Sequence, residues 1–169
     1  MLVAGDFFQI LCETVWNIST KDFTFFIALF GVLSIVANTL GSILIQKMGL
    51  RSFTTLAILS SACSPIGAIL FGFQGILGGS IVGILGAAQS LGVGALLVSE
   101  GVKNGASIGK LAGERSGLMA ILKVVGPIFY GLLFTEGKKW FGMTYLPFFF
   151  NVGLTFVAMI TCYFFLPSS

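Results

Sequence analysis

The chain has 169 residues, of which 56% are hydrophobic and 9% are charged, and its mean hydropathy is +1.04. A water-soluble domain of this size could not bury so much apolar surface, so the composition predicts an all-α, multi-pass membrane protein in contact with the lipid bilayer. The net charge of +3 does not indicate nucleic-acid binding, because lysine and arginine near the ends of membrane helices mainly set their orientation.

Six apolar segments are predicted to cross the bilayer as helices and to form one transmembrane domain over residues 1–169. A hydrocarbon core of about 30 Å needs about 20 helical residues. The expected spans cover residues 2–19, 23–46, 53–73, 76–99, 112–134 and 146–166. The last span is rich in aromatic residues and carries no charge, which favours a lipid-facing position.

The first span is the most polar of the six. Its polar residues recur at steps of three and four, which places them along one helical face: Asp6, Gln9, Glu13, Trp16 and Asn17. Three interpretations stay open: the face lines an aqueous cavity, the segment lies in the interface, or it is the cut end of a longer helix. In a cavity, Asp6 and Glu13 are candidate proton carriers, because desolvation favours the neutral carboxyl and lets it exchange a proton.

The second and third spans carry two features that bear on packing. Asn38 is the strongly polar residue inside the second span, and a hydrogen bond to a neighbouring helix is its favoured role. The third span contains several serines followed by Pro65. Because proline frees a backbone carbonyl, we expect a kink there, with the serines available to satisfy the carbonyl.

The fourth span has a ridge of mostly small residues at steps near four, namely Gly79, Gly83, Ala87, Ser90 or Leu91, and Gly94. Such a ridge lets a second helix backbone approach closely. Gln89 in the same span hydrogen-bonds either a substrate or another helix. The polar segment at residues 100–115 is expected to be the longest loop.

The fifth span contains Lys123 in a stretch that should be surrounded by hydrocarbon. An ionisable residue there is a functional-site hypothesis by default, because the bilayer penalises it unless a cavity or partner takes it up. Lys123 either pairs with an anionic substrate group or with a carboxylate, or it snorkels toward water.

Basic residues in alternate loops predict the orientation of the chain. One set of loops holds five of them, and the opposite set holds three. The five are Lys47, Arg51, Lys103, Lys110 and Arg115. The bias places loops 47–52 and 100–115, together with the C-terminus, in the cytoplasm.

The sequence does not predict catalysis, a metal site or a cofactor. It has no histidine, and its three cysteines lie in apolar segments without metal-ligand spacing. It has no phosphate-binding glycine loop and no paired catalytic set, which argues against an ATP-driven pump or an enzyme.

Two motifs carry a resemblance to a known family. The fifth span follows the pattern G-x3-G-x8-G-P at Gly113, Gly117, Gly126 and Pro127. The loop after the second span has a basic residue, a glycine and a second basic residue at Lys47, Gly49 and Arg51, although Gln46 stands where an acidic residue is expected. On these motifs the chain resembles the C-terminal six-helix half of a major facilitator superfamily transporter, of the drug:proton antiporter and tetracycline-efflux-like branch.

The resemblance implies secondary transport of a small solute by alternating access, with protons as the expected coupling ion. Helices seven and ten of the family, here the first and fourth spans, would line the central cavity. In such a mechanism two bundles rock around a site near the bilayer midplane, and glycine ridges and proline-broken helices supply the slidable contacts.

The length raises a question about partners, since a transporter of this kind needs two six-helix halves. The chain is therefore a fragment of a longer transporter, a half that pairs with a second half or with itself, or a transporter-derived structural subunit of a larger membrane complex. Met1 directly precedes the first span, which is how an internal boundary would look.

Overall fold

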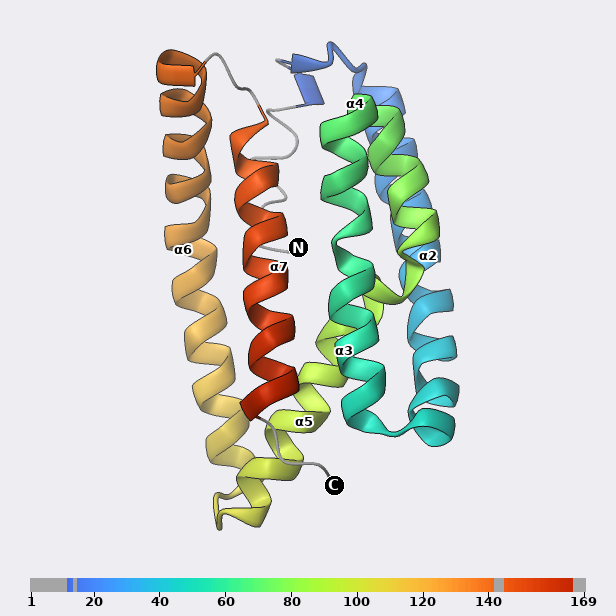
Figure 1. Cartoon of the computed structure of the whole chain (residues 1–169), viewed down its shortest axis with the longest axis vertical. Helices are drawn as coiled ribbons and strands as arrows, with labels where there is room; N and C mark the ends of the chain where they lie inside the picture. Colours follow the sequence, from blue (N-terminus) through green and yellow to red (C-terminus); the bar gives the residue numbers. More distant parts are fainter. Residues whose placement is uncertain (1–11, 14, 142–144, 166–169) are drawn as a thin grey trace. The chain divides into compact units, whose positions relative to one another are not determined.

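The computed structural model describes residues 12–13, 15–141 and 145–165, and every regular element within them is helical (Figure 1). Five stretches are long and apolar enough to cross a membrane: Thr20–Met48, Leu50–Val82, Ile84–Lys103, Ile108–Lys139 and Leu146–Phe164. Large apolar side chains are widely exposed, including Phe25 at 69% and Val82 at 79%. Such a surface belongs in lipid, which confirms the prediction of a helical, multi-pass membrane protein.

The predicted first span falls mostly outside the described residues. Its described part is helical at Cys12, Glu13 and Val15, and the helix ends before Asn17, whose φ of 49° is left-handed. Asparagine tolerates this conformation, which commonly ends helices. The predicted helical end at Ser19 was therefore wrong.

Helix α2 (Thr20–Met48) starts three residues earlier than predicted because a cap precedes it. The Ser19 hydroxyl accepts a hydrogen bond from the Asp22 N–H at 3.3 Å and donates one to the Asp22 carboxylate at 2.7 Å. This pairing satisfies an N-terminal donor that the helix itself leaves unpaired.

Helix α3 (Leu50–Ser61) follows α2 after the single residue Gly49, and α4 (Cys63–Val82) follows α3 after Ala62. The break at Ala62 lies three residues before Pro65, where a kink was predicted. The Ala62 N–H donates a hydrogen bond to the Leu59 carbonyl at 3.1 Å, and the Ser61 hydroxyl donates one to the Ile58 carbonyl at 2.6 Å. The expected interruption near Pro65 is confirmed. The carbonyl that Pro65 leaves without its helical donor is that of Ser61, and the Ser61 hydroxyl bonds the Ile58 carbonyl instead, so the satisfying role of a serine stays a prediction.

Helix α4 folds back on itself at Gly72, whose φ of 62° and ψ of −138° are not helical. A Cβ atom on Gly75 would overlap the Gly67 carbonyl, one on Gly79 the Cys63 carbonyl, and one on Gly83 the Ser60 carbonyl. Glycines later in the chain thus contact residues that lie earlier in the chain, so the two arms are antiparallel, as the neighbouring green ribbons of α4 show (Figure 1). The turn expected at Gln74 and Gly75 thus lies slightly earlier, at Gly72.

The returning arm continues through the short 3₁₀ helix η2 (Ile84–Ala88) into α5 (Gln89–Lys103). Its small-residue ridge does receive another helix backbone, since Gly79 and Gly83 lie directly against the preceding arm. This confirms the packing predicted for the ridge. The close approach also allows weak Cα–H···O=C contacts between the arms.

A small core joins α2, α3, η2 and α5 around the fully buried side chain of Phe53. A Cβ atom on Gly41 of α2 would lie 2.9 Å from the Phe53 ring, and one on Gly92 of α5 would lie 3.3 Å from it. Ala37 and Ala88 complete the contact. Small residues on two helices therefore create the space that one aromatic ring fills.

Helix α6 (Ile108–Phe141) replaces much of the predicted loop at residues 100–115. The described loop is short because α5 extends to Lys103, and the Ser107 hydroxyl accepts a hydrogen bond from the Lys110 N–H at 3.3 Å. Lys110 also pairs with Glu114 at 3.9 Å one turn later. At its other end α6 continues through Glu136, Lys138 and Lys139, which were also expected to lie in a loop.

Helix α7 (Leu146–Phe165) closely matches the predicted sixth span. The chain divides into two compact units: Met1–Phe23 with Leu97–Pro147, and Thr24–Leu96 with Phe148–Ser169. Helix α6 belongs to the first unit, while the α4 hairpin, the Phe53 core and most of α7 belong to the second.

Candidate functional site

Lys123 lies near the middle of α6, a helix of 34 residues. At a rise of about 1.5 Å per residue it is about 12 Å from Arg115 and about 20 Å from Glu136, the nearest charged residues along the chain. Its side chain is exposed, and so are the neighbouring Ile121 and Val124. The ammonium group therefore sits well inside the apolar part of the helix, as the sequence predicted.

No described carboxylate lies within ion-pair distance of the Lys123 ammonium group. The ion pairs described in the first unit, Lys103 with Glu100 at 2.9 Å and Lys110 with Glu114 at 3.9 Å, both lie near the α5–α6 connection. A charge at mid-bilayer depth normally pairs or faces water. At mid-bilayer depth, Lys123 would require an anionic partner, an aqueous cavity, or a path along which its long side chain snorkels to the interface.

Four residues after Lys123, Pro127 interrupts the hydrogen bonding of α6 from inside the helix. In an α-helix the N–H at this position would donate to the Lys123 carbonyl, and proline has no N–H. Gly126 beside it is buried, whereas a Cβ atom on Gly113 or Gly117 would meet nothing within 4 Å among the described atoms. Gly126 is thus less accessible than the first two glycines of the motif, although the flanking Val125 and Ile128 are exposed.

The polar face predicted for the first span is only partly described. Asp6 and Gln9 lie outside the described residues. Glu13 is exposed on the last helical turn and Trp16 is half-buried, but Asn17 has left the helix and does not extend that face. The prediction that one continuous helical stripe includes Asn17 was therefore wrong.

Gln89, the other proposed pathway residue, belongs to the second unit and begins α5 directly after η2. Its side chain is half-buried. Glu13 and Lys123 belong to the first unit, so the proposed pathway residues are divided between the two units.

The loop motif at Lys47, Gly49 and Arg51 forms a tight connection between α2 and α3. Gly49 has a φ of 83°, which strongly favours glycine. Arg51 donates a hydrogen bond to the backbone carbonyl of Tyr163, and its guanidinium carbon lies 5.8 Å from the centre of the Tyr163 ring. Arg51 thereby ties this connection to the C-terminal turn of α7, while Lys47 is exposed. No motif in the sequence identified Tyr163 as its partner.

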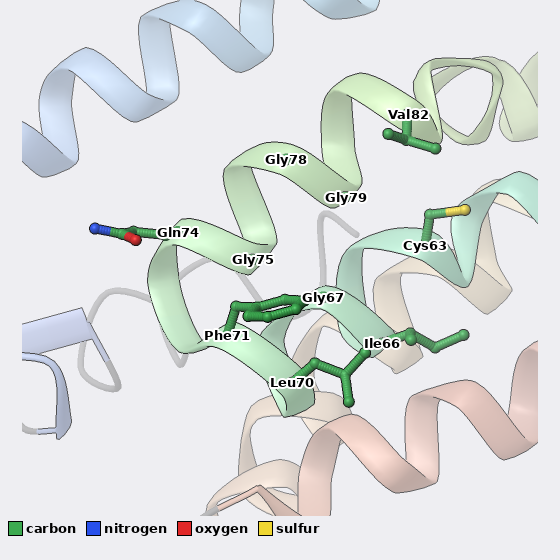
Figure 2. Close-up of a pocket in the computed structure, with 10 residues that line it drawn as sticks. All are labelled: Cys63, Ile66, Gly67, Leu70, Phe71, Gln74, Gly75, Gly78, Gly79 and Val82. Atoms are coloured by element: carbon green, nitrogen blue, oxygen red, sulfur yellow. The ribbon is translucent and has the colours of Figure 1, made fainter.

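A groove of about 460 Å³ lies on the α4 hairpin, between its two arms (Figure 2). Glycines at positions 67, 75, 78 and 79 leave it open, and Ile66, Leu70, Phe71 and Val82 line it. Its lining has no charged residue, and its side chains are apolar apart from the Cys63 thiol and the Gln74 amide. Such a surface suits acyl chains better than a hydrophilic solute.

Among the described residues no cluster of acidic, histidine or cysteine side chains could hold a metal ion.

Together these features define a helical, multi-pass membrane protein with one charged side chain near the middle of an apolar helix and a tightly packed helical hairpin. Searches of protein families, of curated proteins and of solved structures each found no match to the chain.

Proposed function

We propose that the chain is one half of a membrane transporter that moves a small solute by alternating access, of the major facilitator type, with protons as the coupling ion. The observation that carries the proposal is the position of Lys123, an exposed ammonium group near the middle of the apolar helix α6. Ionisable groups at this depth typically mark solute or proton pathways.

Two packing features support the proposal. The arms of the α4 hairpin touch through their backbones at Gly67 and Gly75, which makes the hairpin a compact piece that can move as one body. The Arg51 contact with Tyr163 brings the α2–α3 connection and the end of α7 to one side, in keeping with the proposed cytoplasmic location of both.

A transporter half needs a second half to enclose a solute pathway, so the partner is either a second copy or a separate six-helix chain. Native mass measurement in mild detergent distinguishes these assemblies from a structural subunit. A homodimer or a pair with one other transporter half supports the proposal. A stoichiometric complex with several unrelated subunits supports the structural alternative instead.

The decisive experiment places the purified assembly in vesicles that contain a pH-sensitive dye and adds candidate solutes outside. A transported solute should change the internal pH in the wild type, and Lys123→Ala should abolish the change. Lys110→Ala is the matched control, because Lys110 is an exposed lysine at the start of the same helix and should not affect flux. Equal flux in wild type and Lys123→Ala would contradict the proposed role of α6.

A further inference from the structure

Lys123 contributes two polar groups at one position of α6, a side-chain ammonium and a backbone carbonyl. The carbonyl lacks its regular helical donor because Pro127 stands four residues later. Lys123 therefore has a backbone carbonyl that lacks its helical donor and a side-chain ammonium that offers three N–H donors.

Both groups lie in a segment that offers little else to satisfy them. Between Arg115 and Glu136, Lys123 is the sole charged residue of the sequence. Val124 and Val125 next to it are exposed at 67% and 51%, so the surroundings along the helix are apolar. Unsatisfied polar groups are costly in hydrocarbon, and a ligand that pairs with both would remove that cost.

The two groups point to different ends of the helix. Side chains on a helix incline toward its N-terminus, whereas carbonyls point toward its C-terminus. A ligand that reaches both must therefore carry its negative group and its hydrogen-bond donor several bonds apart.

We infer that the Lys123 ammonium and the Lys123 carbonyl, which Pro127 leaves without its helical donor, form a two-point binding site for an organic anion that carries a separate hydrogen-bond donor. The Lys123 ammonium binds the negative group, and the Lys123 carbonyl accepts the hydrogen bond. This assignment rests on the proposed transport function and names the class of its solute.

Two matched probes test the two contacts, 4-hydroxybenzoate and 4-methoxybenzoate. Both carry a carboxylate, but only the first has a donor at the far end of the ring. Calorimetric titration of the full assembly in lipid nanodiscs should show about fivefold tighter binding of the hydroxyl compound, the effect of one additional hydrogen bond. Lys123→Gln should weaken both probes at least tenfold, and Lys123→Arg should retain them.

The proline variant separates the carbonyl from the charge. Pro127→Ala restores an N–H that can donate to the Lys123 carbonyl. The two probes should then bind with about equal affinity, while the affinity for the methoxy compound stays the same. Pro147→Ala is the control, because Pro147 is the second residue of α7, where the N–H has no helical acceptor. It should leave the preference unchanged.

The outcomes separate this assignment from the transport proposal. Equal affinity for the two probes, a preference that survives Pro127→Ala, or binding unchanged in Lys123→Gln would overturn the two-point site. If the dye-loaded vesicles respond to cationic or neutral solutes and the anions do not bind, the transport function stands and the assignment fails. If no solute of any charge moves protons or binds, both fail.

Discussion

Gly67 and Gly75 face each other across the α4 hairpin so closely that neither position has room for a side chain. A Cβ atom on either residue would overlap the backbone carbonyl of the other. The contact is reciprocal, and it lies near the reversal at Gly72. The separation of the two arms is therefore set by their backbones.

Gly75→Ala should destabilise the protein, because the neighbouring atom is a backbone carbonyl that cannot rotate away. We expect a loss of about 1–3 kcal/mol in the free energy of unfolding, the usual cost of overpacking. The measurement is the unfolding midpoint in a mixed-micelle denaturation series. Gly78→Ala is the matched control, since a Cβ atom at this position of the same helix meets nothing within 4 Å. Equal midpoints for the two variants would contradict the close packing of the arms.

Phe53→Ala should also destabilise the second unit, by removing the ring that α2, α3 and α5 enclose. Truncation of a buried phenylalanine costs about 3–5 kcal/mol in water-soluble cores, and we expect a smaller loss in lipid, where packing contributes without the hydrophobic effect. Phe25→Ala removes an equal side chain that is 69% exposed and should change the midpoint little. A larger effect at Phe25 than at Phe53 would contradict the buried position of the Phe53 ring.

The helices were largely predictable from sequence, and the errors lie at their polar ends. The first span was predicted too long at Asn17–Ser19, whereas α6 is longer than predicted because polar residues continue it at both ends. The sixth span was predicted within one residue because an uninterrupted apolar run defines it. The loop expected at residues 100–115 was wrong because charge suggested exposure to water, which a helix end also provides. The serine cap at Ser107 and the pairing of Lys110 with Glu114 were the local signals that predict helix there.

The reversal at Gly72 shows a different limit. The sequence offers several glycines between Gly67 and Gly79, and only the backbone path decides which of them takes the positive φ. The candidate site was predictable only in part. The position of Lys123 inside an apolar helix follows from sequence alone. The partner of Arg51 did not, because a backbone carbonyl 112 residues away leaves no mark in the sequence.

Arg51→Ala should loosen the last turn of α7 without unfolding the protein. The guanidinium group both donates to the Tyr163 carbonyl and lies over its ring, so its removal leaves a helix-terminal carbonyl without this donor. Hydrogen exchange at the amides of Cys162 and Tyr163 should accelerate about fivefold, equivalent to about 1 kcal/mol. Arg51→Lys should be intermediate, because lysine keeps the charge but not the planar group. Lys47→Ala, at an exposed residue in the last turn of α2, should leave exchange in α7 unchanged.

Glu13→Gln tests proton coupling, the mechanistic part of the transport proposal. Glutamine keeps the size and hydrogen-bonding ability of the side chain but cannot bind and release a proton. If Glu13 carries the coupled proton, solute uptake driven by a pH gradient should be lost in vesicles, whereas exchange of labelled for unlabelled solute should continue. Glu114→Gln is the control, since Glu114 pairs with Lys110 near the start of α6, outside the proposed pathway. Unchanged pH-driven uptake in Glu13→Gln would remove Glu13 from the mechanism and leave Asp6 as the candidate carrier.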